Sequence, residues 1–116
     1  MTDLLLVLTT FPDAAHARQA AAALVEERLA ACASLVPGIE SIYRWQGAVE
    51  TAAEVLLLIK TRAGLYDRLA GRLRGLHPYE VPEILALRPE HASPAYRQWL
   101  LAETGPSNGE PGKLGA

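Results

Sequence analysis

This chain of 116 residues contains little cysteine and no excess of positive charge. Its one cysteine, Cys32, cannot form an internal disulfide and has no CxxC partner for a structural metal site, so a reducing, cytoplasmic setting is expected. The 11 lysine and arginine residues against 13 aspartate and glutamate residues give a net charge of −2. Because nucleic-acid binding calls for a basic surface, we expect no nucleic-acid partner.

Long apolar segments and common catalytic motifs are also missing. The apolar run at residues 4–8 is short, follows Asp3 rather than a basic segment, and is soon followed by Pro12. It predicts neither a signal peptide nor a membrane span, and therefore no membrane partner. The sequence has no glycine-rich phosphate loop and no His-Glu-x-x-His pair. We therefore expect no catalytic residues, no cofactor-binding residues and no enzymatic activity.

The first strand and helix are predicted from the apolar pattern. Residues 3–11 are apolar on both faces and stop at Pro12, which is typical of a strand in the middle of a sheet. Asp13 is the expected N-cap of an alanine-rich helix that runs to about Ala30. The apolar face of this helix comprises Ala14, Ala17, Ala21, Leu24, Val25 and Leu29.

A hairpin of two strands is expected next. The segment from Cys32 to about Val49 is rich in β-branched and aromatic residues and closes at Gln46-Gly47. Pro37-Gly38 interrupts it and predicts a bulge on an edge strand, because proline cannot donate to a ladder. Residues 54–60 give a second buried strand, antiparallel to the first.

The second half of the chain repeats the alternation of helix and strand. Leucines at helical spacing predict a helix from about Gly64. Residues 84–87 predict a short buried strand, and Ser93-Pro94 predicts the start of a third helix that continues through Leu100.

The order βα-ββ-αβ makes two split βαβ units, so the expected fold class is α+β. It is a ferredoxin-like sandwich with a four-stranded antiparallel sheet, two main helices on one face and a short C-terminal helix. This domain is assigned to residues 1–104, and the Gly- and Pro-rich residues 105–116 are expected to form a flexible tail.

The predicted helices are too few to cover both faces of this sheet. The first, third and last strands are apolar on both faces, and a short third helix cannot cover what the main helices leave bare. A closed homo-oligomer would cover that face without another partner. Leu57 and Leu85 are two residues that we expect to face such a partner.

Residues 76–83 place an imidazole, a phenol and two carboxylates at a corner between the second helix and the last strand. Its two prolines hold the backbone stiff and keep His77 extended. His77 can ligate a metal with Glu83 or Glu80, or it can hydrogen-bond backbone carbonyls at the corner.

Two neighbouring groups also leave alternatives open. Glu80 and Glu83 beside a tyrosine can act as acid and base, or one can pair with Lys60 or an arginine. Tyr43, Arg44 and Trp45 can stack a ligand, or they can pack across strands at an interface.

Five segments in order carry a family resemblance: residues 27–32, 36–38, 41–47, 54–61 and 77–83. Over roughly Leu4 to Thr104 they resemble the divalent-cation tolerance family, CutA. The resemblance implies a compact cytoplasmic homotrimer of ferredoxin-like protomers, akin to the PII signalling trimers. It also implies a link to tolerance of copper and other divalent metals, but no known reaction.

Some bacterial members of that family have copper ligands at a cysteine ending the first strand and at paired histidines before the Pro-Tyr. This chain has Thr9 and Leu76 at two of those positions, and only His77 matches. Since the soft thiolate is absent, we expect weak binding of copper(II) or another divalent metal, with His77 and Glu83 as ligands or a group from a neighbouring subunit assisting.

Three functions follow as alternatives from this sequence. The first is a trimeric divalent-metal binding protein that serves copper tolerance and the response to metal ions. The second is a PII-like trimeric sensor of a small anionic ligand. The third is a structural module that anchors other proteins.

Overall fold

The structure, a computed structural model, describes residues 3–106. Within that range the chain forms one four-stranded sheet, three α-helices and a 3₁₀ turn. The strands are β1 (Leu4–Phe11), β2 (Cys32–Trp45), β3 (Ala48–Arg62) and β4 (Leu85–Leu87). The helices are α1 (Ala14–Glu26), α2 (Tyr66–Leu76) and α3 (Pro94–Glu103), and the 3₁₀ turn η1 is Ala63–Leu65.

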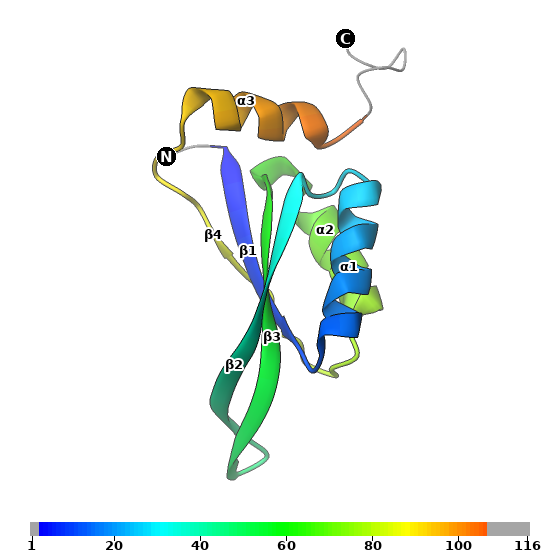
Figure 1. The fold of residues 1–116 in the computed structure, drawn as a ribbon, viewed down its shortest axis with the longest axis vertical. Coiled ribbons are helices and arrows are strands. Elements are labelled where there is room, and N and C mark those ends of the chain that lie inside the picture. The colour runs from blue at the N-terminus through cyan, green and yellow to red at the C-terminus, as the bar shows by residue number, and fades with distance from the viewer. Residues whose placement is uncertain (1–2, 107–116) are drawn as a thin grey trace.

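The sheet has the strand order β2-β3-β1-β4, and each neighbouring pair is antiparallel. Helices α1 and α2 lie on one face, whereas α3 lies across the end of the sheet where β1 begins (Figure 1). This is the predicted ferredoxin-like sandwich, and that prediction is confirmed. The flexible tail predicted from residue 105 falls mainly on residues 107–116, which lie outside the described residues.

The β2–β3 hairpin is longer than predicted and reaches well beyond the helices (Figure 1). Gln46 and Gly47 both have positive φ, 50° and 83°, which makes a two-residue turn suited to the twist of a hairpin. The residues after this turn belong to β3, so the prediction that the first hairpin strand continues to about Val49 is wrong.

The predicted bulge on the edge strand β2 is confirmed. Pairing with β3 shifts between Val36 and Ile39, and β2 is the outer strand of the sheet. Gly38 has a φ of 79°, a conformation that a side chain makes unfavourable. Pro37, which has no amide hydrogen to donate, sits where the ladder is already interrupted.

Helix α1 ends at Glu26 rather than at the predicted Ala30, because the chain turns sharply at Arg28. Arg28 adopts a left-handed φ of 63°, its amide donates to Val25 O, and the amide of Leu29 donates to Leu24 O. This is the hydrogen-bond pattern of a Schellman motif, which usually places glycine at the left-handed position. Val25, expected on the buried face, is exposed at this end of the helix.

The main core fills the space between the sheet and the two helices. It includes Val7 and Ile59 from the central strands and Leu24 and Leu73 from α1 and α2, all fully buried. Leu57 belongs to the same core, so the prediction that it faces a partner is wrong. Alternation along β3 therefore places the neighbouring even-numbered positions on the opposite face of the sheet.

That opposite face carries apolar side chains that one protomer leaves largely uncovered. Leu85 and Leu87 of β4 lie beside Leu8 and Leu6 of β1, and they are 52% and 49% exposed. Helix α3 covers only one end, where Leu100 packs on Leu4 and Ala31 in a second, smaller core. We call the remaining surface the open face. It is defined by Leu6, Leu8, Val36, Leu56, Leu58, Leu85 and Leu87.

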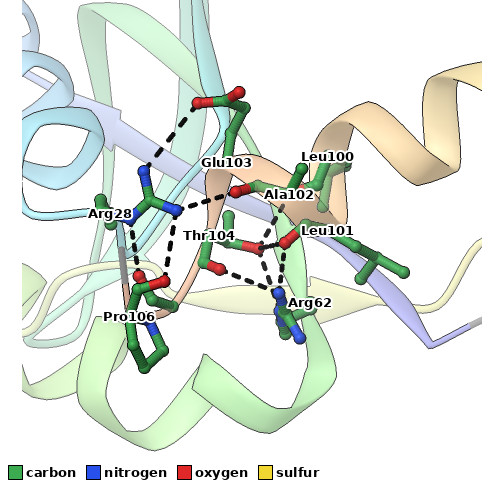
Figure 2. A network of polar contacts seen from close by, with 9 residues as sticks. Arg28, Arg62, Leu100, Leu101, Ala102, Glu103, Thr104 and Pro106 are labelled. Carbon is green, nitrogen blue, oxygen red and sulfur yellow. Dashed lines mark hydrogen bonds and ion pairs between the residues drawn. The ribbon is translucent and has the colours of Figure 1, made fainter. Parts of the chain in front are cut away.

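Two arginines fasten the end of α3 to the rest of the fold (Figure 2). Arg62 at the end of β3 donates to Leu101 O, to Thr104 O at 2.9 Å and to Thr104 Oγ1 at 3.0 Å. Arg28 donates to Gly105 O at 2.7 Å and to Ala102 O at 2.8 Å (Figure 2). These guanidinium groups satisfy carbonyls that a helix C-terminus otherwise leaves without partners.

Candidate functional site

The rigid corner predicted around His77 is present between α2 and β4. His77 is the C-cap of α2 with φ −85° and ψ 134°, the extended conformation that the following proline imposes. Its ring stacks on Phe11, with centroids 4.2 Å apart and planes 16° from parallel. His77 is only 9% exposed, so the imidazole is packed against the main core rather than displayed to solvent.

Both ring nitrogens of His77 already have partners. Nδ1 lies 3.2 Å from the backbone amide of Tyr79 and accepts its hydrogen, so in the neutral ring Nε2 carries the proton. That Nε2–H points at the hydroxyl of Thr9, 3.2 Å away. Burial is the largest influence on the ring and lowers the pKa of His77, while a backbone hydrogen bond with Thr10 and the charge of Glu54 act in the opposite direction. The ring is therefore neutral at pH 7 and bonds a backbone amide and a hydroxyl.

A buried carboxylate meets the tyrosine of the corner. Tyr79 Oη donates to Glu54 Oε2 over 2.6 Å, and Glu54 is only 8% exposed. Burial, followed by the hydrogen bond and the charge of Glu54, raises the pKa of Tyr79 far above its usual value, so the phenol stays protonated. From the sequence, Glu54 is predicted only as the start of a strand. Its contact with Tyr79 becomes visible once the packing of the corner against β3 is known.

The corner and the hairpin together enclose what we call the hairpin pocket. One hollow of about 270 Å³ is lined by Tyr43, Trp45, Tyr79, Glu80 and Val81. An adjoining hollow of about 200 Å³ shares four of those residues. To them it adds Thr10, Ser41, Glu54 and Glu83.

The structure thus brings Glu83 beside Tyr79 and Glu54, and it brings the aromatic residues of β2 to the same place. His77 contacts Tyr79 but does not line the pocket. The proposed partner Lys60 lies elsewhere, because its ammonium donates to Ser34 Oγ over 2.6 Å. Within residues 3–106 no ion pair or hydrogen bond engages the carboxylates of Glu80 or Glu83.

A divalent metal does not find a ready-made site in one protomer. Among the described residues, no three or more His, Cys, Asp and Glu side chains are grouped closely enough to hold an ion. His16 is exposed and bonds the N-cap carboxylate of Asp13 at 2.9 Å, and His91 is exposed beside α3. A metal at His77 would have to displace one of the hydrogen bonds of the ring.

A further hollow of about 350 Å³ lies under α3, at the covered end of the open face. Leu4, Leu100 and Tyr96 line it together with Lys60. The thiol of Cys32 is half-buried, 3.8 Å from Lys60 Nζ. Leu4 and Leu100 belong to the second core, so this hollow resembles an incompletely covered part of that core. None of the helices within residues 3–106 is long and apolar enough to span a bilayer.

Comparison with known proteins gives a consistent result. The sequence model of the CutA1 divalent ion tolerance protein matches residues 5–103. The divalent-cation tolerance protein CutA of Thermus thermophilus is 52% identical over 99 residues, which are 85% of this chain and 96% of that protein. Protein CutA of Mus musculus is 46% identical over 78% of this chain, but the match spans only 51% of the mouse protein.

Solved structures agree with the sequence comparison. The crystal structure of CutA from Xylella fastidiosa superposes with a TM-score of 0.87 at 42% identity, covering 90% of this chain and 100% of that one. The Thermus thermophilus structure gives a TM-score of 0.86 at 50% identity, over 88% of this chain and 99% of that one. The residues that the family model matches, 5–103, span the sheet and the helices, including the corner and the hairpin.

Proposed function

Because this chain belongs to the CutA1 divalent ion tolerance family, we propose that it acts as a cytoplasmic, homotrimeric protein of divalent-metal tolerance that binds copper(II) or another divalent metal weakly. Assembly is inferred from the exposed apolar side chains of the open face, and the link to metal is inferred from the family. No reaction is assigned to it, and its relatives are named as tolerance proteins rather than as enzymes.

Assembly is supported by the amount of apolar surface that one protomer leaves bare. Each square ångström of apolar surface removed from water contributes about 25 cal/mol, so burying several half-exposed leucines stabilises an oligomer by several kcal/mol. The edge strand β2 and the arm of the hairpin add surface that a neighbouring copy can contact. Three copies arranged around one axis would cover these surfaces in every copy, whereas an open array would leave them exposed at its ends.

The test of assembly replaces one leucine of the open face. Leu85→Gln should lower the mass measured by light scattering or cause aggregation. Val25→Gln is the matched control because Val25 is an exposed apolar residue on α1, away from the open face. A wild type that sediments as a monomer at micromolar concentration would refute the trimer, and an unchanged trimer in Leu85→Gln would show that we have assigned the wrong face.

Metal binding is proposed at His77, assisted by Glu83 or by a group from a neighbouring subunit. The arrangement of the ring makes such binding weak, since Nδ1 must release the amide of Tyr79 before it can offer a lone pair. Binding should also fall as the pH drops, because only the neutral imidazole is a ligand. The carboxylate of Glu83 forms no hydrogen bond within residues 3–106, so its oxygens are available as ligands on the same corner of the chain.

Calorimetric titration of copper(II) and zinc tests this assignment. Affinity should be lost in His77→Gln, which retains a polar group at the corner, and kept in His91→Gln. Circular dichroism must first show that both variants are folded. Equal affinity and stoichiometry in wild type and His77→Gln would place the metal elsewhere, with His16 and His91 as the next ligands to replace.

The two alternative functions make different predictions for a panel of ligands. A PII-like sensor of a small anion should be stabilised by nucleotides or carboxylates, and a purely anchoring module by none of the ligands. The hairpin pocket is lined by Glu54, Glu80 and Glu83, which disfavours an anion there. A midpoint of thermal unfolding that rises only with divalent metals would support the tolerance function over both alternatives.

A further inference from the structure

The hairpin pocket combines aromatic side chains with carboxylates. The chain has only one phenylalanine, two tryptophans and four tyrosines, yet Tyr43, Trp45 and Tyr79 all line both hollows of this pocket. Tyr43 and Trp45 occupy alternate positions of β2 and so project from the same side of the strand. Both remain exposed to solvent in the protomer, although large aromatic side chains are favoured in cores and interfaces.

The charge of the pocket has one sign. Glu54, Glu80 and Glu83 line it, and among the described residues no lysine, arginine or histidine does. Glu54 is the most buried of the three, and its Oε2 accepts the phenol hydrogen of Tyr79. Within residues 3–106 no buried side-chain oxygen lacks a hydrogen-bond partner, so the other oxygen, Oε1, which accepts no hydrogen bond there, keeps contact with solvent. A positive group placed in the pocket can therefore reach Oε1 and form a charge-assisted contact with this carboxylate.

The residues that line the pocket indicate which kind of positive group it would bind. A metal ion needs several ligands around one point, and no suitable group of side chains exists in the described part of the chain. The faces of tyrosine and tryptophan instead attract cations whose charge is spread over alkyl groups. Such cations lose little hydration on burial, and their methyl groups pack against aromatic rings.

We propose that the hairpin pocket binds an alkylated ammonium group, as carried by choline or by a trimethylated lysine, with Tyr43 and Trp45 around the alkyl groups and Glu54 balancing the charge. This inference does not rest on metal binding, since it uses neither His77 nor a metal ion. All the described lining groups come from one chain, and the hairpin that carries Tyr43 and Trp45 is also surface that a neighbouring copy can contact in the proposed oligomer.

The experiment compares choline with 3,3-dimethylbutan-1-ol, the neutral molecule of nearly the same shape, by isothermal titration calorimetry on the full chain. Choline should bind at least about tenfold more tightly, because a cation–π contact combined with a carboxylate exceeds the contribution of shape alone. A short peptide with trimethyllysine, titrated beside its unmethylated form, distinguishes a side chain of another protein from a free small molecule as the source of the group.

Three variants assign any binding to the pocket. Glu54→Gln keeps an acceptor for Tyr79 and removes the charge, and it should weaken choline binding several-fold without affecting the neutral alcohol. Trp45→Leu, on the exposed hairpin, should weaken choline binding as well and provides a second variant if Glu54→Gln does not fold. Glu26→Gln is the matched control, because it removes the same charge from an exposed position on α1.

Several results would overturn the proposal. No measurable heat with choline or with the trimethyllysine peptide, equal affinity for choline and the alcohol, or unchanged affinity in Glu54→Gln and Trp45→Leu would each do so. If the wild type does not bind choline and Trp45→Leu dissociates the oligomer, a second copy of the chain fills the pocket instead.

Discussion

Replacing Arg62 by methionine should detach the end of α3 while leaving the main core intact. The guanidinium donates to two backbone carbonyls, Leu101 O and Thr104 O, and to the hydroxyl of Thr104, a residue that is almost fully buried (Figure 2). Methionine keeps an apolar stem of similar length, so the change removes the donors rather than the packing. Leu101 O would then keep only the hydroxyl of Thr104, 3.5 Å away, and Thr104 O would lose its guanidinium donor.

The magnitude follows from the number and kind of bonds lost. A hydrogen bond to a charged group contributes about 1.5–3 kcal/mol, and bonds that share one donor group are not additive. We therefore expect Arg62→Met to lower the free energy of unfolding by about 2–4 kcal/mol. For a chain of roughly 100 residues, each kcal/mol shifts the midpoint of thermal unfolding by about 4 °C, so a decrease of about 8–16 °C is expected.

Urea unfolding gives the free energy, and hydrogen exchange gives the location. Exchange should accelerate in residues 94–104 and stay slow in β1 and β3, because only α3 loses its attachment. Arg68→Met is the matched control, since Arg68 is an exposed arginine on α2. A loss of less than about 0.5 kcal/mol, the range of ordinary surface changes, or faster exchange spread evenly over the sheet would refute this account of the anchor.

Three further predictions concern the corner, the bulge and catalysis. Because burial lowers the pKa of His77, the unfolded chain binds a proton at this residue more readily than the folded chain does. The urea midpoint should therefore fall as the pH drops below about 6.5. His77→Gln should make the midpoint less dependent on pH. Gly38→Ala should lower the free energy of unfolding by about 1 kcal/mol through the positive φ alone, since a Cβ there meets no other atom. Gly64 has equal space and no positive φ, so Gly64→Ala should not lower the free energy of unfolding in the same urea titration. The purified protein should not turn over generic ester, phosphate or thiol substrates, and activity that survives purification but disappears in Tyr79→Phe would contradict this.

The order of elements could be predicted from the sequence because each element has a strong local pattern. The end of α1 could not, because Arg28 occupies a left-handed position that glycine normally marks. The guanidinium of Arg28 bonds carbonyls 74 and 77 positions away along the chain, and no local pattern reveals this contact. The first part of β3 was missed for a different reason. It is largely exposed and lacks the apolar alternation by which a strand is detected, so pairing with β2 rather than burial holds it.

The faces of β3 were ambiguous for a third reason. Every residue from Val55 to Ile59 is apolar, and a strand without alternation gives no information about which side faces the helices. Leu57 was therefore assigned to the wrong face, although Leu85 is exposed as a residue facing a partner should be. The corner at His77 was found because its two prolines are a local signal. The contact of Tyr79 with Glu54 was not found, since it depends on the spatial packing of the corner against β3.

One strand links the surface proposed for assembly to the pocket proposed for a cation. Glu54, Leu56 and Leu58 are at alternate positions of β3, so the carboxylate of the pocket and two leucines of the open face project from the same side of one rigid element. Any closure of the oligomer that shifts this part of β3 must also move Glu54 against Tyr79. Binding in the pocket and association of protomers should therefore be coupled, and linkage requires the effect to be reciprocal. If choline binds more tightly to the assembled protein, it must also lower the dissociation constant of the assembly, by the same factor for each occupied site.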